Sequence, residues 1–234
     1  MKNTEISDGY SQYYRERNLP NVYPVEFVVR SFLGQYPHLN LDKTKFAGSR
    51  ILDLGYGDGR NMLLLHNLKF EIYGVEISEK INRLADVRLQ KLGISATLKV
   101  GRNTFIPFDG GFFQYILSCH SCYYVEEGTN FDDNLREIHR VLAPNGIFIC
   151  SLPMHDTYII LDKAEELSGG HYRIKNDPYG LRNGTIFRAF KNQSEIVETL
   201  GKYFYEFSVG FCDDDFYGIH QKVWIVVCKK RLTE

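Results

Sequence analysis

The segment ILDLGYGDGRN, residues 51–61, contains several residues that could do chemistry. In it an apolar run leads into three glycines at alternate positions. Asp53 lies near the end of the apolar run, and Gly55, Gly57 and Gly59 follow it. A strand that enters a helix through such a turn presents bare backbone N–H groups and a helix N-terminus to a ligand. The segment therefore predicts a nucleotide-type site, and the residues around it indicate the charge of the ligand.

The acidic residues near this turn favour a ligand that carries positive charge. A dinucleotide fingerprint needs its third glycine where this chain has Arg60, and the carboxylate of Asp53 would repel a pyrophosphate. Glu76 ends the next apolar run, where a carboxylate can accept both hydroxyls of a ribose. These features together fit an adenosine with a cationic tail and no phosphate. S-adenosylmethionine has that charge profile.

His120 is the residue that we expect to act as a general base, and it lies in SCHSCYYV, residues 118–125. Histidine titrates near physiological pH, and a positioned base contributes about 10²–10⁴ in rate. A packing or hydrogen-bonding role beside the cofactor is the alternative for His120. His155 is a second candidate base. Cys119 and Cys122 flank His120, but no second ligand pair completes a zinc site, so no metal is expected.

The elements that must position these residues alternate between strands and helices. Near-continuous apolar runs predict strands that are buried on both faces, and periodic segments between them predict helices. The expected strands are residues 50–54, 71–77, 95–101, 112–118 and 146–152, and the expected helices are residues 61–68, 78–93 and 134–142. Repeated strand–helix units imply a doubly wound α/β fold with a mostly parallel sheet.

We interpret residues 1–234 as one domain with four parts. Residues 1–45 form an N-terminal arm and helix, and the polar start of this part is either a loose arm or a helix folded over a site. Residues 46–152 form the cofactor-binding core. Residues 153–190 form an insertion that covers the substrate, and residues 191–234 form a C-terminal helix and antiparallel strands.

Turn and cap residues give these outer parts their expected detail. Asn183 and Gly184 predict the turn of a small β-hairpin in the insertion. Ser194 is expected to cap the last helix. The runs 205–211 and 221–230 have only a short polar link, so we expect them to pair antiparallel at the edge of the sheet.

The composition narrows the class of protein and its partners. The formal net charge of −1 does not favour a partner as acidic as a nucleic acid. The five cysteines are few and odd in number, which is typical of a reducing compartment. No apolar run approaches the length of a membrane span, and the N-terminus lacks an apolar signal core, so we expect a cytoplasmic protein. The sequence makes no prediction of the oligomeric state.

Four stretches in order carry a resemblance to a known family: ILDLGYGDGRN, YGVEIS, IPFDGGFFQYILS and LREIHRVLAPNGIFICSLP. Over about residues 45–155 the chain resembles the class I S-adenosylmethionine-dependent methyltransferases, in the small-molecule branch of methyltransferase-domain 11/25-like proteins. The resemblance implies a Rossmann-like methyltransferase fold, a seven-stranded sheet with an antiparallel last strand. It also implies S-adenosylmethionine as cofactor and S-adenosylhomocysteine as product.

The same resemblance assigns expected cofactor contacts. The expected cofactor-binding residues are Asp53, Gly55, Tyr56, Gly57, Gly59, Asn61, Glu76, Ile77, Asn103, Thr104, Ser118 and Cys119. By analogy Glu76 holds the ribose, and Asn103 and Thr104 lie beside the adenine. Family members often carry an acidic residue after the glycine that follows the third strand. This chain has Arg102 after Gly101 there, so Asn103 or the backbone would make the adenine contact.

The function expected from the sequence is methyl transfer to an oxygen or nitrogen of a small-molecule acceptor by in-line displacement. Two alternatives stay open: a methyltransferase acting on a tRNA or other RNA nucleoside, and a cofactor-binding protein without catalysis. The segment NDPY, residues 176–179, is similar to a motif of amino-directed nucleic-acid methyltransferases, but it does not follow the fourth strand and instead indicates a turn. A nicotinamide cofactor is disfavoured by Asp53 and Arg60.

Overall fold

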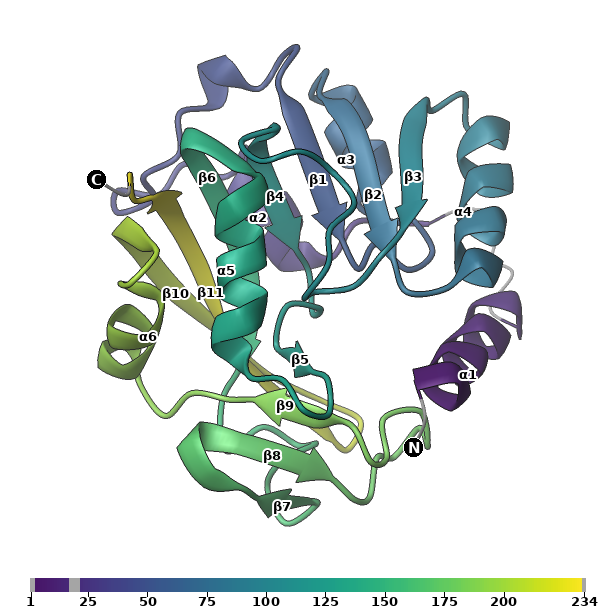
Figure 1. The fold of residues 1–234 in the computed structure, drawn as a ribbon, viewed down its shortest axis with the longest axis vertical. Helices are drawn as coiled ribbons and strands as arrows, with labels where there is room; N and C mark the ends of the chain where they lie inside the picture. Colours follow the sequence, from purple (N-terminus) through teal and green to yellow (C-terminus); the bar gives the residue numbers. More distant parts are fainter. Residues whose placement is uncertain (1–2, 17–21, 233–234) are drawn as a thin grey trace.

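A seven-stranded sheet forms the centre of the molecule in the computed structural model, which describes residues 3–16 and 22–232 (Figure 1). The strand order is β10-β11-β6-β4-β1-β2-β3. The strands are β1 Arg50–Leu54, β2 Glu71–Glu76, β3 Ala96–Val100, β4 Phe113–Ser118, β6 Leu142–Pro153, β10 Phe204–Phe216 and β11 Ile219–Lys230. Only β11 runs antiparallel to both of its neighbours. The structure thus confirms the expected doubly wound, mostly parallel sheet with an antiparallel last strand.

Helices cover the sheet, and Figure 1 shows α5 crossing the near face. The helices are α1 Asn3–Glu16, α2 Glu26–Leu33, α3 Met62–Asn67, α4 Glu79–Lys91, α5 Phe131–Val141 and α6 Gln193–Leu200, with short 3₁₀ turns η1 Lys43–Lys45 and η2 Ser168–Gly170. Successive strand residues face opposite layers. Leu52 packs in the cluster that contains α5, and Ile51 packs in the cluster that contains α2, α3 and α4. Both faces of the sheet are therefore apolar, as the continuous apolar runs predicted.

Side-chain caps fix where two of the helices begin. Ser78 caps α4, as predicted, and its hydroxyl accepts a hydrogen bond from the backbone N–H of Lys80. The prediction of Ser194 as the cap of the last helix was wrong. Asn192 caps α6 instead, because its side-chain oxygen accepts from the backbone N–H of Glu195 at 2.9 Å.

The insertion is more than the hairpin expected from Asn183 and Gly184. Strands β8 His171–Ile174 and β9 Ile186–Arg188 do pair antiparallel, but residues 175–185 connect them as a loop rather than a tight turn. Two further strands, β5 Tyr124–Val125 and β7 Ala164–Glu166, complete a second sheet in the order β5-β9-β8-β7. The extra strands satisfy backbone groups that an isolated hairpin would leave at its edges. Because β5 follows β4 directly, this sheet joins the insertion to the core.

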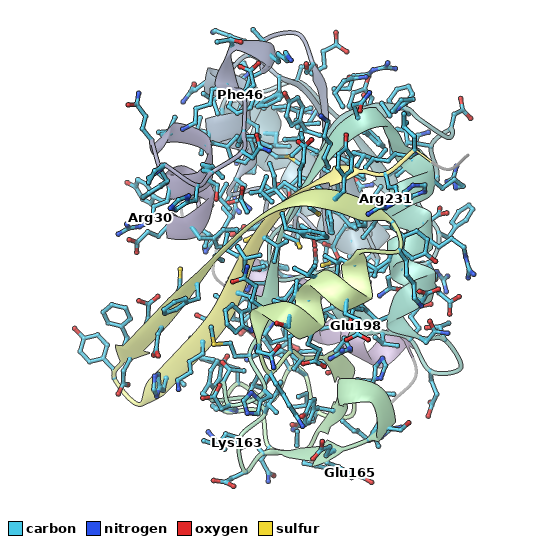
Figure 2. All side chains as sticks on the ribbon, turned by 90° about the vertical axis from the view of Figure 1, so that its left-hand side faces the viewer. Arg30, Phe46, Lys163, Glu165, Glu198 and Arg231 are labelled. Carbon is cyan, nitrogen blue, oxygen red and sulfur yellow. The ribbon has the colours of Figure 1, made fainter. Side chains whose placement is uncertain are left out.

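The last two strands are longer than expected, since the polar link between the predicted runs continues as strand. The chain reverses at Tyr217 and Gly218, whose φ angles of 52° and 89° suit a tight hairpin turn. Figure 2 shows this yellow hairpin projecting beyond the rest of the molecule. Among the residues that the structure describes, no helix is both long and apolar enough to cross a membrane.

Candidate active site

One cavity of about 660 Å³ lies at the carboxyl ends of the parallel strands. Gly55 and Glu76 line it at the ends of β1 and β2, and Tyr124 and Arg182 line it near the small sheet. In Figure 1 the arrowheads of β1, β2 and β3 point toward α1 and the small sheet. Ligands of open α/β sheets bind at this edge, so the cavity is the candidate active site.

The cavity brings together eight of the fourteen site residues expected from the sequence. Those that line it are Gly55, Tyr56, Asn61, Glu76, Ile77, Asn103, Cys119 and His120. Those that do not line it are Asp53, Gly57, Gly59, Thr104, Ser118 and His155. Position alone does not assign a contact, so all the expected cofactor contacts stay predictions.

Glu76 lies at the end of β2 with each carboxylate oxygen already holding one donor. Its Oε2 accepts from the backbone N–H of Gly57 at 3.1 Å, and its Oε1 accepts from the backbone N–H of Ile77 at 3.0 Å. Burial raises the pKa of this carboxyl, and the two N–H groups pull it back down. Each oxygen keeps lone pairs that a ligand hydroxyl can use.

Asp53 is fully buried at the carboxyl end of β1 and has no polar partner among the described residues. Neither of its carboxylate oxygens makes a hydrogen bond to any of them. Burial, followed by the negative charges of Glu76 and Asp58, raises the pKa of Asp53 to about 8. The carboxyl is therefore mostly protonated at neutral pH, and a cation bound beside it would favour the ionised form. A buried polar group left without a partner is costly, which suggests that a ligand completes the site.

Gly57 is covered by the N-terminal helix rather than open to the cavity. Its φ is +56°, and a Cβ at this position would overlap the hydroxyl of Tyr14. Gly59 faces the other way, since a Cβ there would lie 3.5 Å from the side chain of Leu89 on α4. In this structure Gly57 thus admits the Tyr14 side chain, and Gly59 lies against the helix layer.

Three more of the expected residues hold the loops around the cavity. Asn103 donates to the backbone oxygens of Ser121 and Tyr124, at 2.9 and 3.1 Å. Thr104 donates to Glu126 at 3.2 Å. The Ser118 hydroxyl shares a hydrogen bond with that of Ser121 at 2.7 Å. These bonds fix the strand-end loops, and only Asn103 of the three also lines the cavity.

His120 follows β4 in a left-handed conformation, with φ +57°. Its backbone N–H donates to the hydroxyl of Ser151 at 2.9 Å, and its Nδ1 lies 3.2 Å from the same oxygen. Burial, and then the positive charges of Arg182 and Arg60, lower the pKa of His120 to about 4. The imidazole is therefore neutral at physiological pH, which is the form that can accept a proton.

His155 occupies a different place from His120. It follows β6, its Nδ1 lies 3.9 Å from the carboxylate of Asp156, and it does not line the cavity. The other members of the SCHSC segment also separate, because Cys119 lines the cavity and Cys122 is buried in the core. Within residues 3–16 and 22–232, no group of three or more His, Cys, Asp or Glu side chains is arranged to hold a metal ion.

Tyrosines from α1 form a wall that the sequence-based list of site residues missed. Tyr10, Tyr13 and Tyr14 line the cavity, and the Tyr10 hydroxyl lies 2.7 Å from the Tyr124 hydroxyl. Their spacing of three and four residues puts them on one face of a helix, so the sequence did carry a signal. Of the two alternatives for the N-terminal part, the helix folded over a site is confirmed.

Comparison with known proteins finds a family model and solved structures that resemble this chain. Residues 52–150 match the family model described as "Methyltransferase domain". A solved structure of a SAM-dependent methyltransferase from Methanosarcina mazei superposes with a TM-score of 0.64 at 19% identity, covering 85% of this chain and 99% of that chain. Residues 52–150 are thus similar to a methyltransferase domain, and the chain shares the fold of a SAM-dependent methyltransferase.

Two further matches extend the comparison. The structure of a 1,6-didemethyltoxoflavin-N1-methyltransferase from Burkholderia thailandensis, with 1,6-didemethyltoxoflavin and S-adenosylhomocysteine bound, has a TM-score of 0.58 at 16% identity, covering 79% of this chain and 72% of that chain. A ubiquinone biosynthesis O-methyltransferase from Ruegeria pomeroyi is 22% identical over 138 residues, which are 59% of this chain and 54% of that protein. The chain spans about half the length of the curated relatives it matches.

The cofactor of these methyltransferases is S-adenosylmethionine, and the residues around the cavity fit it. Asp53 offers a buried carboxyl without a partner beside the glycine turn, which suits a ligand that carries an ammonium and a sulfonium. Glu76 lines the cavity and can accept ribose hydroxyls. Val100 and Phe105 line the same side and offer apolar surface for an adenine ring.

Proposed function

We propose that this chain transfers the methyl group of S-adenosylmethionine to an oxygen or nitrogen of a small-molecule acceptor by in-line displacement. The observation that carries the proposal is the continuity of the cavity. A single hollow runs from Gly55 and Glu76, the cofactor side, to Tyr124 and Arg182, the acceptor side. A donor and an acceptor held in one enclosed space gain rate from proximity and orientation.

The chain's own residues have distinct parts in this proposal. The cofactor, when bound, supplies a methyl group already activated by its sulfonium. Glu76 accepts the ribose hydroxyls, and Asp53 compensates the cofactor's positive charge. His120 takes a proton from the acceptor: with Ser151 as acceptor for the Nδ1–H, the basic nitrogen is Nε2. The aromatic side chains of α1 and the insertion exclude water from the reacting groups.

A small molecule suits the acceptor end better than an RNA. The acceptor end is lined by Tyr10, Tyr123, Tyr158 and other aromatic side chains, which suit a compact acceptor with apolar faces. The formal net charge of −1 also gives no general attraction for a phosphate backbone. The N1-methyltransferase matched above has a small molecule, 1,6-didemethyltoxoflavin, bound in its structure, which is consistent with this proposal.

The test is a methyl-transfer screen with isotope-labelled S-adenosylmethionine. Purified protein is incubated with fractionated metabolite pools and, separately, with total tRNA, and the labelled product is identified by mass spectrometry. We expect label in a small molecule, and much less of it with Glu76→Gln protein at the same concentration when the cofactor is below saturation. Label in tRNA would favour the nucleoside alternative. Cofactor binding without label in either pool would contradict catalysis and favour the binding-protein alternative.

A further inference from the structure

At the acceptor end, one positively charged side chain lines the cavity while its acidic ion-pair partner does not. Among the residues that the structure describes, four arginines line the cavity: Arg60, Arg102, Arg173 and Arg182. The first three pair with acidic residues that line the cavity too, namely Asp58, Glu126 and Glu127, at 3.5, 3.6 and 3.6 Å. Arg182 pairs with Asp177, which does not line the cavity. Arg182 therefore presents a cation that no wall carboxylate offsets.

Asp177 fixes the guanidinium of Arg182 in place. Its side chain is fully buried, and it accepts from Arg182 Nε at 3.0 Å and from Arg182 Nη2 at 2.7 Å. It also accepts from the backbone N–H groups of Tyr179, Leu181 and Arg182 itself. Because three backbone N–H groups also bind this carboxylate, Asp177 holds the guanidinium of Arg182 in place without fully neutralising its charge. The loop between β8 and β9 is thus folded around a preorganised arginine.

Aromatic rings surround this arginine on the cavity side. The rings of Tyr158 and Tyr179 lie 5.8 and 5.6 Å from its Cζ, within cation–π range. The charge of Arg182 also acts on groups near the candidate base. After burial, it is the largest cause that lowers the pKa of His120. It also opposes the rise in the pKa of Tyr124 that burial causes. Arg182 therefore lies close enough to the candidate base to act on a group held beside it.

We infer that the acceptor carries an anionic oxygen group, a carboxylate or an acidic ring hydroxyl, which binds Arg182 while the rest of its planar body packs against the surrounding tyrosines. This inference rests on the proposed function and names its substrate class. A planar fork is suited to a carboxylate, and an enclosed position strengthens the contact relative to one in water. The tyrosines supply apolar faces for a ring and hydroxyls for its substituents.

The experiment compares three ring fragments of similar size, namely benzoate, benzamide and benzylammonium. Their binding to the protein saturated with S-adenosylhomocysteine is measured by ligand-observed NMR titration. A charge-assisted contact predicts that benzoate binds about 10-fold more tightly than benzamide, with benzylammonium weakest. Arg182→Gln should abolish the preference for benzoate. The double variant Asp177→Asn with Arg182→Gln should do the same without leaving a buried carboxylate unpaired.

Arg83→Gln is the matched control, since Arg83 is an exposed arginine on α4 whose loss removes the same charge outside the cavity. It should keep the preference for benzoate. The inference is overturned if benzamide or benzylammonium binds as tightly as benzoate, if no fragment binds, or if the preference persists in both Arg182 variants. S-adenosylhomocysteine affinity is measured separately for each protein. If the wild-type protein does not bind S-adenosylhomocysteine, the proposed function is contradicted. If it binds S-adenosylhomocysteine but shows no preference for benzoate, only the inferred anion site is contradicted.

Discussion

The carboxylate of Glu76 accepts a hydrogen bond from the backbone N–H of Gly57 at 3.1 Å, which ties the end of β2 to the glycine turn after β1. Two segments that are separate in the chain thus meet at one carboxylate. The turn is held in shape by the same group that is proposed to hold the ribose. Cofactor recognition and the conformation of the turn are therefore expected to depend on each other.

Glu76→Gln should weaken S-adenosylhomocysteine binding about 10- to 100-fold, which corresponds to the loss of about 1.5–3 kcal/mol for a hydrogen bond to a charged group. Free adenosine should lose a similar factor, because the contact is to the ribose. Titration calorimetry with both ligands gives the two factors. Glu79→Gln is the control, because Glu79 is an exposed acidic residue at the start of α4, and this variant should bind as the wild type does. Equal affinity in the Glu76 variant would remove the ribose assignment.

Asp53 should release a proton when the cofactor binds. Its pKa of about 8 leaves the carboxyl mostly protonated at pH 7, and a bound cation lowers the pKa, so the proton is lost on binding. Calorimetry of S-adenosylmethionine binding at pH 7, in two buffers of different ionisation enthalpy, should show nearly one proton released. At pH 9 the carboxyl is already ionised, and the release should vanish. The Asp53→Asn variant is the control, and an unchanged proton count in it would contradict this role.

Gly57→Ala should lower the melting temperature more than Gly48→Ala. Both glycines have positive φ, 56° and 77°, so both variants bear the strain of a left-handed residue. Only at Gly57 does the added Cβ also overlap a side chain, that of Tyr14, while Gly48 has open space. Thermal unfolding of both variants separates the two effects. Adding Tyr14→Ser should return Gly57→Ala to the level of Gly48→Ala, and no recovery would contradict the overlap.

His120→Gln should lower kcat by about 10²–10⁴ while S-adenosylhomocysteine affinity stays nearly unchanged, once the screen has supplied an acceptor. Since its pKa is lowered to about 4, His120 is neutral throughout the usual assay range, and kcat should show no histidine titration above pH 6. His155→Gln, outside the cavity, is the matched control. Full activity of the His120 variant would leave a packing role beside Ser151 and Phe27.

The sequence predicted the sheet well because its signals are local. Near-continuous apolar runs such as residues 112–118 favour buried strands, and Ser78 caps the helix where it was expected. The insertion was harder, because β5 and β9 pair across a long stretch of chain, and no local pattern specifies that partner. The ion pair of Arg182 with Asp177 was missed, because the segment NDPY, residues 176–179, indicated only a turn.

Charge at the site was only partly predictable. The sequence indicated a carboxylate at Asp53 but not its protonation, because the pKa depends on burial and on Glu76, which the fold brings close. The tyrosines of α1 were visible as a spacing, yet the place of Tyr14 over Gly57 depends on tertiary packing. Residue type alone therefore could not predict the chemistry of these side chains, because the fold determines the environment of each one.

The most direct test of the central claim is a titration of the purified wild-type chain with S-adenosylhomocysteine and, separately, with NADH. An adenosyl ligand with a cationic end favours the ionised form of the buried Asp53 carboxyl, whereas a pyrophosphate would bring further negative charge beside Asp53 and Glu76. The account predicts binding of S-adenosylhomocysteine at about micromolar affinity, near −8 kcal/mol, and no measurable binding of NADH. Tight binding of NADH with no binding of S-adenosylhomocysteine would contradict it.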